Sequence, residues 1–216
     1  MKIRKDSMLP PPAKINNGGW VTFAVIAVLA IIGFGFTACD DSGGGGGSSC
    51  NEECLAIGAA GEGGGKIIYH NHAGFTVTGA GSFTAYYLEA ASTIQAYAIK
   101  WSSTDVDVTD ATGTAIGTGK ANTAAIIAAH SSDTASNNAA KAANITIGGK
   151  SDWFLPSKDE LNQLYRARSH FNINSDEWVW SSSQAHISLA WYQNFKGNQD
   201  VFSKETGFNV RAVRAF

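Results

Sequence analysis

A run of glycine and serine, Ser42–Ser49 (SGGGGGSS), divides the chain into an N-terminal segment and a body. Runs of this kind behave as flexible coils, because glycine and serine bury little surface when they become ordered. They do not contribute to a packed core. A second glycine stretch, Gly61–Gly65, precedes the first strand-like segment. We therefore expect a flexible tether over residues 40–64 and one folded domain over residues 65–216.

The N-terminal segment has the pattern of an export signal. Val21–Phe36 is an uncharged apolar run of 16 residues behind a basic flank, shorter than the roughly 20 residues of a comfortable membrane span. The run ends in Phe36-Thr37-Ala38-Cys39, which resembles a bacterial lipobox, although Phe36 replaces the usual aliphatic residue. The pattern predicts a signal peptide over residues 1–39 and lipidation of Cys39. An uncleaved single-span anchor is the alternative.

Both the lipoprotein signal peptide and the uncleaved anchor would place residues 40–216 outside the cytoplasm. Lipidation of Cys39 would anchor the chain to the cell envelope, at the outer membrane or cell surface. The membrane is then one partner of the chain. Residues 1–39 carry a net charge of +3, so the remainder of the chain, whose total is −2, carries −5. Nucleic-acid affinity comes mostly from Lys and Arg on phosphates, so an acidic body excludes nucleic acid as a partner.

The sequence of residues 65–216 predicts strands, then helices, then further strands. Lys66–His70 and Gly74–Thr78 resemble two strands joined by a turn near Asn71. The remaining expected elements are a strand over 86–90, a long loop over 101–119, helices over 121–130 and 135–144, strands over 178–183, 190–195 and 208–216, and a turn over 196–198. This order is typical of an α+β fold.

The strongest local signal is a helix start at Ser157. Ser157 and Glu160 form an S-x-x-E capping box, in which each side chain accepts from a free backbone N–H of the first turn. Asp159 adds a negative charge at the positive end of the helix dipole. The apolar spacing that follows predicts a helix over residues 158–168. In the strand over 190–195, alternation places Trp191 and Phe195 on one face.

The ordered motifs DWFLPSKDELNQLY, WSSS, AW…F…G and VRAVRAF resemble the Lcl C-terminal domain family, in the formylglycine-generating-enzyme-like branch of the C-type lectin fold. The resemblance covers residues 63–216. Together with the lipobox and tether, it is similar to treponemal lipoproteins and variable proteins. It implies paired first and last strands, residues 66–70 beside 210–216, two or three helices and a small twisted antiparallel sheet. It also implies a ligand face away from the termini.

The resemblance implies binding. In some relatives, diversity-generating retroelements rewrite a C-terminal stretch, which by position would be residues 183–209 here. The ligand-binding residues that it implies are Gln184, His186, Ser188, Tyr192, Asn194, Lys196, Asn198, Asp200, Phe202 and Ser203. The scaffold residues that it implies are Trp153, Trp180, Trp191, Phe195, Arg211 and Arg214. Mixed polar and aromatic side chains on a rigid frame are what a paratope uses. A solvated loop region without a ligand is the alternative.

Enzymatic chemistry finds little support. The enzyme branch oxidises its substrate through a pair of cysteines in the lectin-like domain, and no cysteine follows Cys54. Ser181–Ser183 lack the G-x-S-x-G elbow of a hydrolase. We predict neither catalytic residues nor a cofactor. Cys50 and Cys54, spaced C-x3-C, either form a small disulfide loop or remain two thiols.

Metal sites are also not expected. His70 and His72 fall on one strand face, but the sequence shows no third ligand near them. The loop acids Asp105, Asp107 and Asp110 lack the glycine and glutamate offsets of an EF-hand, so we interpret them as solvated. Arg211 and Arg214 are expected in structural ion pairs; their candidate partners are Asp159, Glu160 and Asp176.

The sequence therefore favours an exported lipoprotein whose C-type lectin-like domain binds a protein or glycan ligand. The alternative is a structural or envelope-assembly module that packs on a partner lipoprotein. Exposed aromatic side chains separate the two hypotheses. A contiguous patch on the face formed by residues 183–209 favours a ligand site, and a patch near the termini favours envelope packing.

Overall fold

The computed structural model describes residues 54–216. The predicted signal peptide, the lipidation site Cys39, Cys50 and most of the tether lie outside the described residues. Among residues 54–216, no helix is both long enough and apolar enough to cross a membrane.

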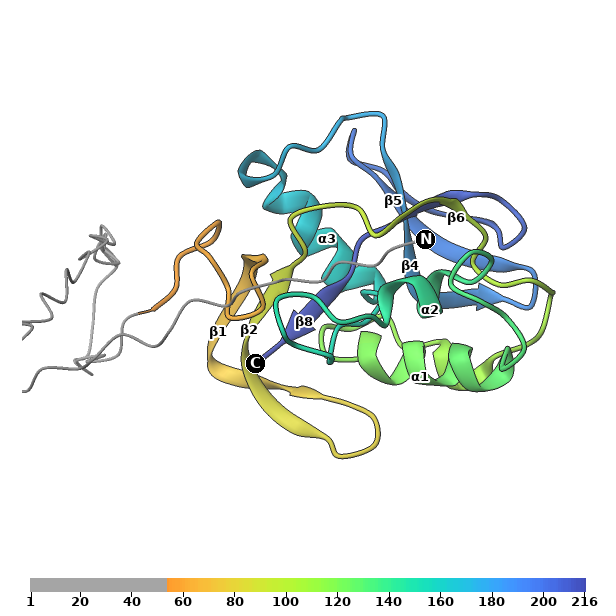
Figure 1. The fold of residues 1–216 in the computed structure, drawn as a ribbon, viewed down its shortest axis with the longest axis horizontal. Helices are drawn as coiled ribbons and strands as arrows, with labels where there is room; N and C mark the ends of the chain where they lie inside the picture. The colour runs from red at the N-terminus through yellow and green to blue at the C-terminus, as the bar shows by residue number, and fades with distance from the viewer. Residues whose placement is uncertain (1–53) are drawn as a thin grey trace, which may run out of the picture. The chain divides into compact units, whose positions relative to one another are not determined.

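The described chain forms two sheets and a few short helices, so the α+β prediction is confirmed (Figure 1). The strands are β1 (Lys66–Val77), β2 (Phe83–Ala90), β3 (Ala96–Ile99), β4 (Trp178–His186), β5 (Leu189–Asn194), β6 (Gln199–Ser203), β7 (Phe208–Val210) and β8 (Val213–Ala215). The helices are α1 (Gly119–Ala129), α2 (Ala139–Ala143) and α3 (Lys158–Arg166), with 3-10 turns η1 (Thr109–Ala111) and η2 (Arg168–His170). One sheet has the order β1-β2-β8, and the other has the order β3-β7-β4-β5-β6.

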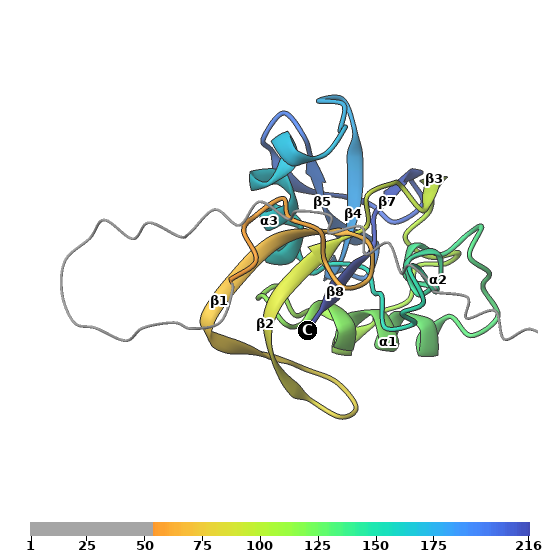
Figure 2. The ribbon, with the colours of Figure 1, turned by 60° about the vertical axis from the view of Figure 1, so that its left-hand side comes forward.

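The two predicted strands at 66–70 and 74–78 are one bent strand, β1. Its pairing with β2 is interrupted between His70 and Phe75 and then resumes. The Asn71 side chain accepts a hydrogen bond from the Ala73 backbone N–H, and Gly74 takes a φ of 75°. These local features bend the strand without reversing it, because β2 continues alongside (Figure 2).

The expected pairing of the first and last strands is wrong. β2 lies between β1 and β8, and Leu88 of β2 is paired with Ala215 of β8. The expected last strand over 208–216 is also two strands in different sheets. The break falls at Ala212, whose backbone N–H donates to the side chain of Gln95 and whose carbonyl accepts from Ala91. The chain thereby crosses from β7 in the larger sheet to β8 in the smaller.

The predicted capping box is confirmed at α3. The Ser157 hydroxyl accepts from the Glu160 N–H, and the Glu160 carboxylate accepts from the Ser157 N–H at 2.7 Å. α3 ends at Arg166, two residues before the predicted end, and the chain continues as η2. α2 is shorter than the predicted helix over 135–144, because Asn137 caps a turn at Thr134 and Asn138 starts the helix.

The helices cover the larger sheet from two sides. Leu161 and Leu164 of α3 pack in one core with Val179 of β4 and residues of β1, β2 and β8. Ile126 of α1 packs with Trp180 of β4 in a second core, together with α2 and the loop after β3. α3 thus joins the two sheets, while α1 and α2 lie against the other side of the larger one (Figure 1).

Residues 55–64, which the sequence analysis assigned to the tether, form hydrogen-bonded turns against β1 and β2. The Gly58 N–H donates to the Ile67 carbonyl at 2.8 Å, and the Gly61 N–H donates to Gly65. The buried Glu89 carboxylate accepts from the N–H groups of Gly63 and Gly65. The glycines are ordered because a buried carboxylate needs donors, and backbone without side chains can approach it closely.

Candidate ligand-binding face

Aromatic side chains gather on one face of the larger sheet. The strand register places Tyr192 of β5 opposite Trp180 of β4, and Phe202 of β6 opposite Ala190 of β5. Because side chains alternate along a strand, these residues share a face. The aromatic face consists of Trp178, Trp180, Tyr192, Phe202 and Phe208.

The rings of the aromatic face contact one another closely. Trp178 is stacked on Tyr192 with ring centroids 5.0 Å apart and planes 10° from parallel. Phe208 lies at the centre, 4.5 Å from Trp180 and 5.5 Å from Phe202 between centroids. Offset stacked and edge-to-face rings of this kind add about 0.5–1.5 kcal/mol per pair beyond their buried area. The cluster is therefore a rigid surface.

Burial changes steadily across the aromatic face. Trp180 is completely buried, whereas Trp178 is 37% exposed and Phe202 is 42% exposed. The two exposed rings also contact each other edge to face, with centroids 6.3 Å apart. The buried rings anchor the cluster, and the exposed pair presents one continuous apolar surface to solvent.

A groove of about 470 Å³ runs beside the exposed pair. Trp178, Phe202 and Phe208 form its apolar wall, and its other lining residues are Asp176, Thr206, Gly207 and Asn209. A side chain at Gly207 would meet the Ala98 carbonyl of β3 at 2.7 Å, so the wall requires glycine there. Aromatic rings with a few polar groups at the edge are the usual lining of a ligand site.

The predicted ligand residues divide by exposure. His186, Lys196, Asn198, Asp200 and Phe202 are exposed, Ser188 and Ser203 are half-buried, and Gln184, Tyr192 and Asn194 are buried. Only Phe202 among the ten lines the groove. Lys196 lies near it, because its ammonium forms an ion pair with Asp176 of the lining at 2.5 Å.

The three buried members have framework contacts. The Asn194 side-chain oxygen accepts from the backbone N–H groups of Lys196, Gly197 and Asn198, and so holds the turn that was predicted at 196–198. Tyr192 is covered by Trp178. Gln184 accepts from the Val108 N–H and from the Lys204 ammonium, and it donates to Asp107.

Lys204 is fully buried below β6. Its ammonium donates to the Val106 carbonyl and to Gln184, and lies 4.4 Å from the centre of the Trp101 ring. Burial lowers the pKa of Lys204 to about 8, although Asp105 and Asp107 oppose the shift. The loop acids are exposed, as the sequence analysis expected, and Asp107 also bonds Gln184.

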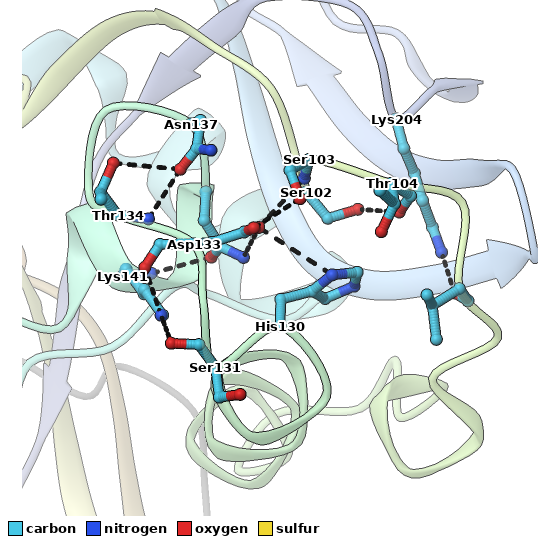
Figure 3. A network of polar contacts seen from close by, with 12 residues as sticks. Ser102, Ser103, Thr104, His130, Ser131, Asp133, Thr134, Asn137, Lys141 and Lys204 are labelled. Carbon is cyan, nitrogen blue, oxygen red and sulfur yellow. Dashed lines mark hydrogen bonds and ion pairs between the residues drawn. The ribbon is translucent and has the colours of Figure 1, made fainter.

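A second polar network fixes the loop after β3 to the segment between α1 and α2 (Figure 3). The Asp133 carboxylate accepts from the Ser103 N–H and from the Asn138 amide, each at 3.0 Å. Burial alone would raise the pKa of Asp133, but these hydrogen bonds lower it. His130 lies beside it, and burial lowers the pKa of His130. Fixed in this way, the loop packs through Trp101 in the same core as Trp180, Tyr192 and Phe208 of the aromatic face.

The predicted scaffold residues make structural contacts. The buried indoles of Trp153 and Trp180 donate to the carbonyls of Ile147 and Ile99. On the face of β5 that α3 covers, Phe195 packs on Tyr165 and the Lys158 ammonium lies over Trp191. The predicted sharing of one face by Trp191 and Phe195 agrees with these contacts.

The predicted ion-pair partners of the two arginines are wrong. Arg214 pairs with Glu89 and Asp152, and Arg211 lies 3.9 Å from Glu177 and donates to the Ala91 carbonyl. Glu89, Asp152 and Ala91 lie in segments for which the sequence gives no sign of pairing with the C-terminal strand. The topology decides them, because β8 pairs with β2, which carries Glu89.

Most of the residues that line the groove were not predicted from the sequence. Asp176 and Trp178 precede the stretch assigned to ligand binding, and Thr206 and Phe208 were not singled out within or beside it. One signal was present. Trp178 and Trp180 are two residues apart in a predicted strand, so their side chains share a face.

The fold and the face together define an α+β domain with a rigid sheet, a helix that joins two sheets and an open aromatic groove. The model of the Lcl C-terminal domain family matches residues 89–214, more than half of the chain. The chain belongs to the Lcl C-terminal domain family. The comparison with curated proteins gives no match.

Proposed function

We propose that this protein is an exported, lipid-anchored module of the C-type lectin-like class that binds a protein or glycan ligand on its aromatic face. The observation that carries the proposal is the contact between the exposed rings of Trp178 and Phe202 beside the groove. Rigid aromatic rings supply large contact area at low entropic cost, and binding surfaces are enriched in them.

The lining of the groove favours binding over catalysis. Asp176 is the only titratable residue among its lining residues, and it is an exposed partner of Lys196. Nucleophilic catalysis commonly pairs a nucleophile with a base within hydrogen-bond reach, and this lining contains no such pair. Asn209 and Thr206 supply amide and hydroxyl groups that suit the polar edge of a glycan or a peptide backbone.

The position of the groove suits outward display. In Figure 1 the start of the described chain and the C-terminus lie on the side of β1, β2 and β8, and β6 lies on the other side. A membrane anchor at the N-terminal side would leave the aromatic face accessible. This arrangement favours a ligand outside the cell over packing against an envelope partner.

We propose retroelement diversification only for the exposed positions of the stretch 183–209. His186, Asn198 and Asp200 are exposed, so substitutions there cost little stability. Gln184 and Asn194 hold the framework and would be costly to vary. A template repeat and a reverse transcriptase gene beside this gene would support diversification, and their absence would leave a binder of fixed specificity.

The test is a binding screen of the lipid-free chain, residues 40–216, against arrays of glycans and extracellular-matrix proteins. We expect Trp178→Ser with Phe202→Ser to abolish binding that the parent shows. Tyr97→Ser is the matched control, because Tyr97 is 70% exposed and lies outside the groove lining. Circular dichroism establishes that each variant is folded.

A different result of the screen would place the binding surface near the C-terminus instead of on the aromatic face. Tyr86 lies near the C-terminus, where its N–H donates to the Phe216 carbonyl, and it is 48% exposed. Binding that survives the groove variant and is lost in Tyr86→Ser would place the ligand site at the terminal side and overturn its assignment to the aromatic face. A parent chain that binds nothing on either array would also count against the proposal.

A further inference from the structure

A thiol and two imidazoles meet at the start of the described chain. His70 and His72 lie two residues apart on β1, with ring centroids 4.1 Å apart. The Cys54 sulfur lies 3.8 Å from Nδ1 of His72. One ligand atom from each of the three residues lies within 4.8 Å of the others. The expectation that these histidines lack a third ligand is therefore wrong.

The turns before β1 create this cluster. The hydrogen bonds between Gly58 and Ile67, and between Ile67 and Ala59, fold the preceding segment back along β1. Cys54 therefore lies beside His72, 18 residues away in sequence. Because the sequence analysis assigned this segment to a flexible tether, the proximity was not predictable from spacing.

We propose that Cys54, His70 and His72 bind a zinc-class transition-metal ion through one thiolate and two imidazole nitrogens. Zinc is bound at about 2.3 Å from sulfur and about 2.0–2.1 Å from nitrogen in a tetrahedral site. Those lengths place sulfur and nitrogen about 3.5 Å apart. The separation between Cys54 and His72 is already close to this value, and small side-chain rotations bring His70 into range.

The surroundings orient two of the three ligands. The His70 ring is stacked on Tyr87, with centroids 4.5 Å apart and planes 7° from parallel. Tyr87 is stacked in turn on Phe216, and its hydroxyl accepts from the N–H of Leu55, the neighbour of Cys54. One anchored tyrosine thus positions both the strand ligand and the chain segment that carries the cysteine. Partners around the ligands commonly set metal affinity in this way.

The donor set selects the ion. A thiolate with imidazoles suits zinc, copper or nickel, whereas calcium and magnesium prefer oxygen ligands, and this cluster contains no carboxylate. Three protein ligands leave one tetrahedral position for water or for a donor from another molecule.

The competing chemistry is oxidation. Cys50 lies outside the described residues, and a disulfide between Cys50 and Cys54 would remove the thiolate that the site needs. The lipid-free chain, residues 40–216, is therefore titrated with Co²⁺ under a reductant that does not bind metals. Cobalt replaces zinc in tetrahedral sites and absorbs visible light there, and a thiolate ligand adds a charge-transfer band.

We expect one Co²⁺ per chain, a thiolate band, and displacement of cobalt by Zn²⁺. Cys54→Ser should abolish the band, and His72→Ala should weaken binding by at least the 10–100-fold known for loss of supporting residues. The matched controls are His186→Ala, an exposed histidine elsewhere, and Cys50→Ser, and both should bind as the parent does. Thermal denaturation with and without Zn²⁺ should show metal-dependent stabilisation of the parent.

Several results would overturn the site. One is a parent chain without a thiolate band under reducing conditions. Another is a folded Cys54→Ser variant that binds as tightly as the parent. Loss of binding in Cys50→Ser would place the metal on the cysteine pair and remove the role of the histidines. None of these measurements depends on the ligand of the aromatic face, so the two proposals fail separately.

Discussion

Two buried cations hold the two ends of this domain, and they are held differently. Arg214 in the smaller sheet donates to Glu89 at 3.0 Å and to Asp152 at 2.6 Å. Lys204 below the aromatic face donates only to neutral oxygens, the Val106 carbonyl and the Gln184 amide. Burial alone would lower the pKa of both. The hydrogen bonds and charges of Asp152 and Glu89 raise that of Arg214, whereas that of Lys204 is lowered to about 8.

The difference indicates what each end is for. The Arg214 end fixes where the chain enters the domain, since Glu89 also binds the turn at Gly63 and Gly65. Breaking a buried ion pair leaves an uncompensated charge, so this end tolerates little change. The Lys204 end supports the loop that carries the exposed acids Asp105 and Asp107, and this loop shares a core with the aromatic face. It depends on packing around one ring, Trp101, more than on charge pairing.

The largest expected effect is at the paired end. Arg214→Met should reduce the free energy of unfolding by about 3–5 kcal/mol, because Glu89 stays buried without its cation. Urea denaturation at neutral pH measures this. Lys150→Met is the matched control: its ion pair with Glu62 is exposed, and such pairs contribute about 0–1 kcal/mol. Equal losses in the two variants would show that burial does not distinguish the pairs.

Glu160 is a buried carboxyl group whose hydrogen-bond partners are uncharged, and it extends the comparison of Arg214 with Lys204 to an acid. Glu160 accepts from the N–H groups of Ser157 and Gly117, yet burial raises its pKa from 4.5 to about 7. Between these values the unfolded chain releases the proton and the folded chain keeps it, so stability falls as pH rises. The loss at this site should reach about 3 kcal/mol by pH 8.

Glu160→Gln should remove that slope. Urea denaturation of parent and variant at several values between pH 5 and pH 8 gives the difference. We expect the parent to lose stability relative to the variant over this range. Parallel curves would mean that the backbone donors keep Glu160 ionised in the folded protein throughout.

Lys204→Met should have a smaller effect, about 1–2 kcal/mol, because a similar apolar chain leaves no charge behind. The Val106 carbonyl loses this donor, whereas the Gln184 oxygen keeps the donor that Val108 supplies. The sign of the pH dependence also differs from that of Glu160. Above pH 8 the folded state binds fewer protons at Lys204 than the unfolded state, so stability at this site rises with pH. Between pH 7.5 and pH 9, the melting temperature of the parent should therefore rise relative to that of the variant. A loss as large as that in Arg214→Met would contradict the distinction between the two ends.

The smallest effect is expected at the exposed ring. Phe202→Ser should cost under about 1 kcal/mol in unfolding free energy, since 42% of Phe202 is exposed and its neighbours remain packed on Phe208. Chemical denaturation measures it, with the completely buried ring of Trp180, as Trp180→Ser, for comparison. A large loss at Phe202 would make it a scaffold residue and weaken its use as a binding probe.

Sequence reasoning succeeded where the interactions are local. The capping box at Ser157 and Glu160 places its partners three residues apart, so its helix could be predicted, and only its last turn was not. Alternation along β5 likewise separates Trp191 from Tyr192. The family resemblance was confirmed because it rests on ordered motifs that span the domain.

Sequence-based prediction failed where side chains distant in the sequence determine the path of the backbone. The break at Ala212 depends on the side chain of Gln95, 117 residues earlier in the chain. The strand β3 is only four residues long, half of them alanine, and β6 carries polar residues, so neither shows a clear alternation of apolar and polar side chains. The burial of Gln184 depends on contacts with Val108 and Lys204, which only the folded topology brings together.

The turns at 58–65 also have a mechanical consequence. A force that pulls on the chain before residue 54 is first carried by the hydrogen bond from Leu55 to the Tyr87 hydroxyl and by those between Gly58, Ala59 and Ile67. The bonds of Gly63 and Gly65 to Glu89 come next. These turns would peel away under load before β1 separates from β2. A chain pulled from this end would therefore lengthen first at these turns, while the larger sheet, with its aromatic groove, would keep its shape.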